Sequence, residues 1–151
     1  MSLSKAQIGR CGELLVQFML LKHGIDSSPL TTDVGVDLVA YSPRQPRAVT
    51  VQVKTNLTPK PGGGKGKPAL DWWVKDELKA DIFAFVDLKS PRVWLVKSSE
   101  LESLSQQHPA GRFHLYMAVD RTQTPRKDRK KKCADDFHEY LFKNRVAEIF
   151  G

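Results

Sequence analysis

A seven-residue run at positions 49–55, Val-Thr-Val-Gln-Val-Lys-Thr, alternates apolar and polar side chains as a β-strand does. Its three valines are predicted to face a core, while Gln52 and Lys54 point to the opposite side, about 6.6 Å apart along the strand. Core strands seldom carry a lysine. We therefore expect this polar pair to have a partner on a neighbouring strand.

Asp37 is the candidate partner, since it lies in a second strand-like run, residues 35–41. The two runs are separated by a polar segment with two prolines, which predicts a turn and an antiparallel hairpin. A carboxylate, an amide oxygen and an ammonium group meeting across neighbouring strands would suit a divalent metal ion and its activated water. For Asp37 alone, a solvated position or a salt bridge with Lys54 is an equally good interpretation.

The N-terminal segment predicts a helix from Lys5 to about Gly24. Ser4 and Gln7 have the spacing of a capping box, and glycine commonly follows a helix end. Glu13 lies off the apolar face, so a solvated position and a functional role both fit it. The predicted buried stripe consists of Ile8, Cys11, Leu14, Leu15, Phe18 and Leu21.

The rest of the chain alternates strands and helices. Apolar strands are predicted over 80–88 and 93–96 and a further strand over 112–119, with helices over 99–107 and 135–150. Trp72 and Trp73 are interpreted as packing residues rather than base-stacking platforms. At 151 residues, 40% of them hydrophobic, the chain is predicted to form one α/β domain over 1–151.

The net charge of +7 comes almost entirely from the segment 121–132, which has seven Lys or Arg and one Asp. Such a segment favours a polyanionic partner, DNA above all. A second basic stretch, 59–68, is rich in glycine and does not have the spacing of a phosphate-binding P-loop. The residues expected to grip the DNA backbone are Lys65, Lys67, Arg126, Lys127, Arg129, Lys130, Lys131 and Lys132.

Several function classes are not indicated. No apolar run has the roughly 20 residues that a membrane span needs, and no secretory signal is visible, so a cytoplasmic location is expected. The two cysteines predict free thiols rather than a disulfide or a zinc site. The four histidines do not cluster with acids or cysteines, and none of them is assigned to a site.

Read in order, a helix with Glu13, a strand with Asp37 and the Val-Gln-Val-Lys-Thr strand resemble the PD-(D/E)XK nuclease superfamily, in particular its small single-domain members. The runs Ala-Asp-Ile-Phe-Ala-Phe-Val-Asp-Leu and Val-Trp-Leu-Val-Lys-Ser-Ser-Glu-Leu are similar to the downstream half of such domains. The resemblance covers roughly residues 4–107. It implies a restriction-endonuclease-like fold, a mixed sheet of about five strands flanked by helices.

The resemblance also implies roles for single residues. Asp37 would be the principal metal-binding carboxylate, with Gln52 and the backbone carbonyl of Val53 as further ligands and Lys54 as the catalytic lysine. Glu13 would complete the metal shell, directly or through water. The implied activity is Mg²⁺-dependent endonucleolytic hydrolysis of DNA, with Mn²⁺ able to replace Mg²⁺.

Gln52 departs from the more common carboxylate of the superfamily, and a neutral amide holds a divalent cation less strongly. Two other hypotheses therefore stay open: a catalytically silent nucleic-acid-binding module, and a protein-interaction domain whose basic segment serves solubility. A chain with one site would cut both DNA strands as a homodimer or in two successive encounters.

Overall fold

The computed structural model describes residues 2–32, 34–62, 66–120 and 131–151. Its centre is a five-stranded sheet in the order β1-β2-β3-β6-β7. These strands are β1 (Asp26–Pro29), β2 (Leu38–Tyr41), β3 (Val49–Asn56), β6 (Ile82–Asp87) and β7 (Arg92–Lys97). Only β3 and β6 pair in parallel, so the sheet is mixed. The predicted α/β class, the number of strands and the antiparallel hairpin of β2 and β3 are confirmed.

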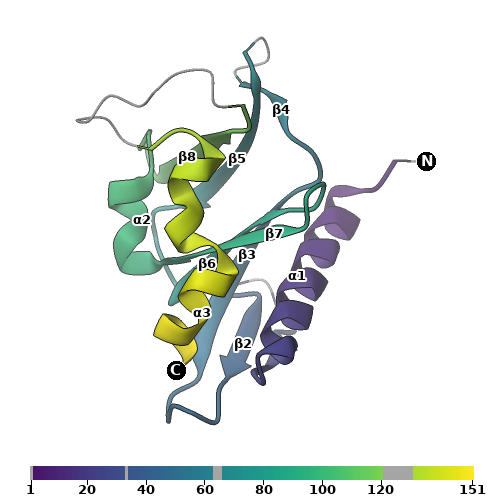
Figure 1. The fold of residues 1–151 in the computed structure, drawn as a ribbon, viewed down its shortest axis with the longest axis vertical. Helices are drawn as coiled ribbons and strands as arrows, with labels where there is room; N and C mark the ends of the chain where they lie inside the picture. The colour runs from purple at the N-terminus through teal and green to yellow at the C-terminus, as the bar shows by residue number, and fades with distance from the viewer. Residues whose placement is uncertain (1, 33, 63–65, 121–130) are drawn as a thin grey trace.

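Helix α1 (Lys5–Lys22) and helix α3 (Phe142–Phe150) cover one face of this sheet (Figure 1). The predicted capping box is present, because the Ser4 and Gln7 side chains each accept the other residue's backbone N–H. Gly24, with φ of 74°, follows the helix end as expected. Val51 is buried under these helices with Val49 and Val53 packed beside it, which confirms the predicted core side of β3.

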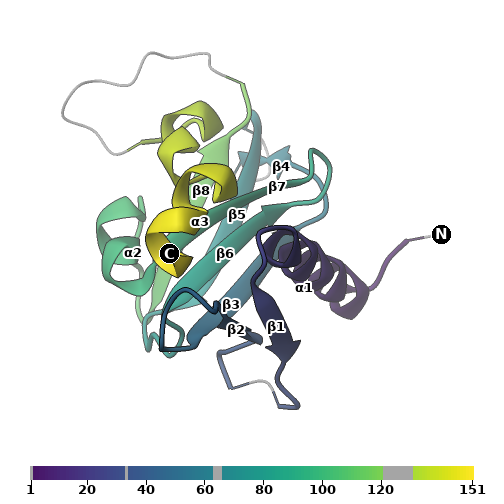
Figure 2. The same ribbon diagram turned by 60° about the horizontal axis from the view of Figure 1, so that its bottom comes forward.

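A second sheet, which the sequence analysis did not predict, covers part of the other face. Its order is β4-β5-β8, with β4 (Lys60–Pro61), β5 (Pro68–Lys75) and β8 (Arg112–Ala118). In the sequence, β4 and β5 lie between β3 and β6, whereas α2 (Ser98–Leu104) and β8 follow β7 (Figure 2). The second sheet's inner side chains pack against Phe83, Phe85 and Trp94 of the central sheet. The inner side chains are Leu70, Trp72, Val74, Phe113, Leu115 and Met117.

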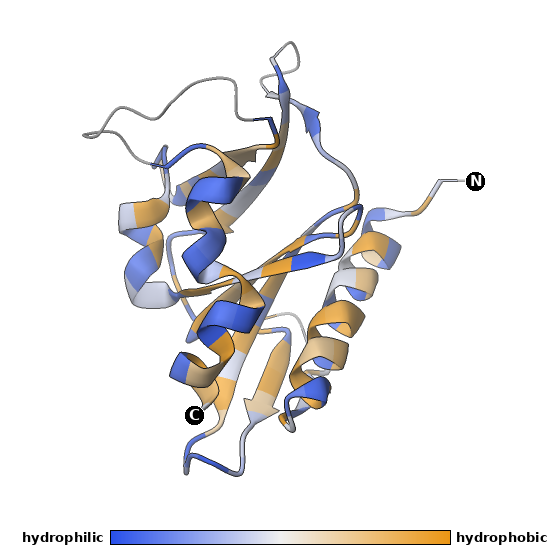
Figure 3. Cartoon of the chain, viewed as in Figure 1, coloured by the Kyte–Doolittle hydropathy of each residue, from blue (hydrophilic) through white to orange (hydrophobic). Residues whose placement is uncertain are grey.

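The predicted buried stripe of α1 is wrong at most of its positions, although Leu15 does pack against the core. Gly12, Val16 and Leu20 face the sheet, whereas Leu14, Phe18 and Leu21 are 50%, 59% and 63% exposed. Cys11 is exposed as well. The helix is apolar on both sides, as its orange turns in Figure 3 show, so hydrophobicity alone could not select the buried face. The close approach at Gly12 selects it.

The C-terminal segment also differs from its prediction. The expected helix over 135–150 is a 3₁₀ helix, Ala134–Tyr140, followed by α3 with a break at Leu141. Leu141 has a non-helical backbone, with φ of −55° and ψ of 143°, and pairs with Trp94 at the edge of the central sheet, which interrupts the helix. Within the described ranges, no helix is long and apolar enough to cross a bilayer.

Asp81 connects β6 to the start of β3. Its Oδ2 accepts hydrogen bonds from the backbone N–H and the hydroxyl of Thr50, at 3.0 and 2.9 Å, and its Oδ1 pairs with Arg47. Burial alone would raise the pKa of Asp81, but the Thr50 hydrogen bonds and the Arg47 charge outweigh it and hold that pKa below its ordinary value.

A lowered pKa in the folded state means that the ionised carboxylate stabilises the fold above the unfolded pKa and that this contribution disappears as the pH falls. We therefore expect Asp81→Asn to cost about 1 kcal/mol at pH 7, after allowance for solvent screening of a partly exposed group. The difference from the wild type should shrink as the pH falls below about 4. Urea unfolding at pH 7, 4 and 3 measures it. A difference that stays constant over this range would contradict the assignment.

Candidate active site

The candidate site lies where β2 and β3 part. Their pairing ends at Leu38 and Val51, and the Asp37 N–H donates to the Val51 carbonyl at 2.9 Å. Beyond that point, Asp37 Oδ2 accepts the Val53 N–H at 2.7 Å. A side-chain carboxylate thus occupies the place at which the next backbone carbonyl of β2 would bind. This contact fixes Asp37 against the strand that carries Gln52 and Lys54.

The direction of the Val53 carbonyl follows from the direction of the Val53 N–H. In a β-strand, the N–H and the C=O of one residue point toward the same neighbouring strand. The Val53 N–H points to Asp37, so its carbonyl is directed to this edge too, past the end of the β2–β3 pairing. The Asp37 carboxylate and the Val53 carbonyl, two predicted ligands, therefore lie on one edge of β3.

Gln52 and Lys54 point to the face opposite α1, as the alternation predicts. They lie beside Phe83 and Phe85 in the β3–β6 register, and both phenylalanines belong to the core under the second sheet. Both polar residues are half-buried. In the part of the chain that the structure describes, neither side chain has a hydrogen-bond or ion-pair partner. An amide and an ammonium group at a half-buried edge are thus available to a ligand.

Glu13 lies on α1, apart from the face of β3 that carries Gln52 and Lys54. Helix α1 packs on the Val51 and Val53 face of β3, so Glu13 starts from the other side of the sheet from Gln52 and Lys54. Its carboxylate forms an ion pair with Arg10, one turn earlier, at 3.0 Å, and its side chain is 24% exposed. The structure joins Asp37 to Val53, whose neighbours in β3 are Gln52 and Lys54, and Glu13 would have to leave Arg10 to approach this group.

These residues fit a hard cation such as Mg²⁺. A carboxylate, an amide oxygen and a carbonyl are all oxygen donors, and Mg²⁺ keeps several waters in addition to one or two protein carboxylates. No group of three His, Cys, Asp or Glu that could hold a metal ion occurs among the described residues. A closed site made by protein side chains alone is therefore not found there, whereas an open site at β3, completed by phosphate and water, needs only the donors present.

The basic residues fall into two groups. Lys65, Arg126, Lys127, Arg129 and Lys130 lie outside the described residues. Lys67 and Lys132 are exposed, with backbone groups bonded near the edges of the second sheet. Lys131 is paired with Glu139 and lies 5.5 Å from the Tyr140 ring centroid, so its charge is partly neutralised.

Two features of this region were missed by the sequence analysis. Asn56, one strand period beyond Lys54, donates its side-chain N–H to the Asp71 carbonyl at 2.7 Å and ties β3 to the second sheet. His114, which was given no role, lines a hollow on that sheet together with Asp71. The alternation of apolar and polar residues along 112–118 was a usable signal, since it places His114 on an outer face.

Comparison with known proteins supports the fold. No protein-family model and no curated protein matches the chain. Among solved structures, the chain is similar to the bacterial homing endonuclease I-Ssp6803I, with a TM-score of 0.61 and 15% sequence identity. The similarity covers 95% of this chain and 93% of that one. At this identity the comparison shows a shared nuclease-like fold, extending over the C-terminal part that the sequence resemblance left out.

Proposed function

We propose that the protein is a Mg²⁺-dependent endonuclease that hydrolyses DNA phosphodiester bonds. The observation that carries the proposal is the Asp37 carboxylate held on the Val53 N–H where β2 and β3 part, with Gln52 and Lys54 on either side of Val53 in the sequence. The whole-chain fold similarity to a homing endonuclease supports it. The PD-(D/E)XK resemblance of the motif agrees with both.

Each residue has a physical role in this proposal. Asp37, Gln52 and the Val53 carbonyl would hold the metal ion, which would supply Lewis-acid activation of the phosphate and of the attacking water. Lys54 orients that water and offsets the negative charge that develops on the phosphate in the transition state. Glu13 would complete the metal shell, directly or through water, once its carboxylate leaves Arg10.

The net charge of +7 supplies the attraction for the DNA backbone. Lys67 and Lys132 are exposed on the second sheet's side of the molecule. The other basic residues that the sequence predicts to bind DNA contribute further contacts with the phosphates in this proposal. A chain with one such site would cut both strands as two copies or in two successive encounters.

The test is cleavage of supercoiled, linear and branched DNA in Mg²⁺, in Mn²⁺ and in EDTA, by the wild type, Asp37→Ala and Lys54→Ala. We expect nicking by the wild type only, and only with metal. Equal residual cleavage by all three proteins would point to a contaminating nuclease and refute the proposal.

The neutral side chain of Gln52 favours a second candidate, a DNA-binding module of the same fold without hydrolytic activity. This candidate predicts binding with a steep salt dependence and no cleavage in any metal ion. Electrophoretic retardation at several salt concentrations, run beside the cleavage assay, separates the two functions.

Gln52→Glu should strengthen metal binding if Gln52 is a ligand. A second carboxylate raises the attraction for the cation, and we expect the Mg²⁺ concentration for half-maximal cleavage to fall about ten-fold, equivalent to about 1.4 kcal/mol. Gln52→Ala should raise it, because an oxygen donor is lost. Cleavage rates in a Mg²⁺ titration measure both shifts. Unchanged titration curves would show that residue 52 does not touch the metal.

A further inference from the structure

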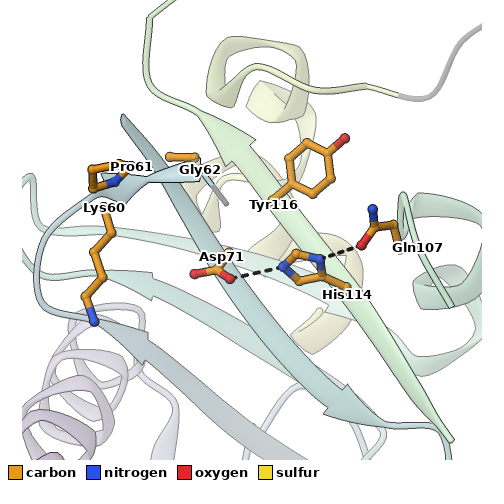
Figure 4. Close-up of a pocket in the computed structure, with 8 residues that line it drawn as sticks. Lys60, Pro61, Gly62, Asp71, Gln107, His114 and Tyr116 are labelled. Carbon is orange, nitrogen blue, oxygen red and sulfur yellow. Dashed lines mark hydrogen bonds and ion pairs between the residues drawn. The ribbon is translucent and has the colours of Figure 1, made fainter. Parts of the chain in front are cut away.

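A hollow of about 390 Å³ lies on the outer face of the second sheet, the face turned away from the core (Figure 4). Side chains from β4, β5 and β8 and from the loop before β8 surround it. The polar and aromatic side chains that line it are Lys60, Asp71, Gln107, His114 and Tyr116. The volume is in the range of small-ligand sites and suits one nucleotide rather than an extended polymer.

His114 is held rigidly at the centre of this hollow. Its Nε2 lies 3.0 Å from Asp71 Oδ2, and its Nδ1 lies 3.2 Å from Gln107 Oε1 (Figure 4). Two backbone hydrogen bonds between Gln107 and His114 fix the same pair. Because both ring nitrogens are engaged, His114 offers a ligand the face of its ring rather than its edge.

One face of the His114 ring is already covered. Trp73 stacks on it with ring centroids 3.9 Å apart and planes 3° apart, and Arg112 lies 4.9 Å from the Trp73 ring centroid. His114 lines the hollow and Trp73 does not, so Trp73 supports the His114 ring from outside the hollow. Tyr116 stands 5.6 Å from that ring at a tilt of 50°. The hollow therefore has an aromatic wall backed by stacked, partly immobilised rings.

The polar groups of the hollow complement a nucleotide. Asp71 Oδ1 has no partner among the described residues and can accept hydrogen bonds from an amino group on a base. Lys60 belongs to the same lining and supplies a positive charge for a phosphate. Lys60 and His114 lie on either side of Asp71 (Figure 4). Aromatic faces, an acceptor and a cation within one small hollow are the groups that bind unpaired nucleotides.

The hollow is also connected to the candidate active site. Asn56 lies on the same face of β3 as Lys54, about 6.6 Å farther along the strand, and its side chain binds the Asp71 carbonyl. Asp71 thus belongs both to the contact with β3 and to the hollow. The contact between Asn56 and Asp71 therefore links the strand that carries Lys54 to the wall of the hollow.

We propose that this hollow binds one unpaired nucleotide of the DNA, with its base on the His114 and Tyr116 rings and its exocyclic amino group on Asp71. The inference rests on the proposed function and deepens it, because it assigns the substrate to DNA with an unpaired position near the cut rather than to perfect duplex. Adenine, whose exocyclic amino group is a donor, is favoured over thymine, whose exocyclic oxygens are acceptors.

Fluorescence anisotropy in EDTA, without cleavage, tests the hollow separately from the catalytic site. The probes are a labelled perfect duplex and the same duplex with one bulged adenine or one bulged thymine. The proteins are the wild type, Tyr116→Ala, Tyr116→Phe and Asp71→Asn. Tyr41→Ala is the matched control, since Tyr41 is 52% exposed on β2 and away from the hollow.

We expect the wild type to prefer the bulged adenine to the perfect duplex. Tyr116→Ala should weaken binding of the bulged DNA about ten-fold, as expected from the loss of one base-stacking contact, and change duplex binding less than two-fold. Tyr116→Phe and Tyr41→Ala should bind as the wild type does. Asp71→Asn replaces an acceptor with an amide, so it should shift the preference from adenine toward thymine.

Tyr116→Ala weakening both DNAs equally, or neither, would overturn the inference, as would an unchanged base preference in Asp71→Asn. A wild type that never cleaves DNA but shows the expected binding differences would refute the nuclease and leave the nucleotide site in place. Cleavage of DNA by a wild type that shows no preference for unpaired bases would refute the nucleotide site and leave the nuclease in place.

Discussion

Lys54→Met is expected to slow DNA cleavage by about 10² to 10⁴ while leaving the protein folded and able to bind DNA. Lys54 is half-buried beside Phe85, so in the proposed mechanism its charge would act on the reacting phosphate with less screening than at a fully exposed position. The loss of one positioned charge or proton-transfer group has an effect of this size. Single-turnover cleavage of an end-labelled duplex in excess protein gives the rate directly.

Lys143→Met is the matched control, because Lys143 is an exposed lysine on α3 and α3 covers the other face of the central sheet. Metal binding by Lys54→Met, measured by calorimetry, should stay within a few-fold of the wild type, since an ammonium group is not a metal ligand. A rate equal to that of Lys143→Met would remove Lys54 from the mechanism.

Gly12→Ala is expected to destabilise the protein by about 3 kcal/mol. A Cβ at this position would lie 1.9 Å from Thr55 Oγ1 and 2.9 Å from Thr55 Cβ. Thr55 is β-branched and sits in β3, so it cannot turn away cheaply. The helix must therefore move off the sheet, at the cost typical of an overpacked core. Chemical denaturation measures the loss.

Gly9→Ala provides the control on the same helix. Apart from the helix's own backbone and the adjacent residues, no atom of the described residues lies within 4 Å of a Cβ built at Gly9. This change should therefore stabilise α1 by up to about 1 kcal/mol through helix propensity alone. The double variant Gly12→Ala with Thr55→Ala should recover part of the stability. Similar effects of the two glycine changes would show that α1 does not approach β3 closely at Gly12.

The part of the site on β3 could be predicted because it depends on local rules. Strand alternation alone placed Gln52 and Lys54 together and opposite the valines, and the two-proline turn brought Asp37 to the neighbouring strand. Resemblance added the Val53 carbonyl, and strand geometry then directs that carbonyl to the same edge. None of these steps required knowledge of a distant part of the chain.

Features set by tertiary contacts could not be predicted. The buried face of α1 depends on the small size of Gly12 against Thr55, and the apolar residues on both sides of the helix concealed it. The second sheet depends on β5 pairing with β8, about forty residues later. Without this pairing, the sequence could not show which of Trp72 and Trp73 faces the core. Trp72 is a packing residue, as predicted, whereas Trp73 is 38% exposed and stacks on His114.

The central claim is that a divalent metal ion binds where β2 and β3 part. Fe²⁺ in place of Mg²⁺, with hydrogen peroxide, ascorbate and a short DNA duplex present, should cut the polypeptide near the ion. Fe²⁺ reduces the peroxide to hydroxyl radical and hydroxide at the site, and ascorbate returns the resulting Fe³⁺ to Fe²⁺. We predict cuts close to Asp37 and to residues 52–54, suppressed by excess Mg²⁺ and absent in Asp37→Asn. Cuts elsewhere in the chain, or the same cuts in Asp37→Asn, would contradict the claim.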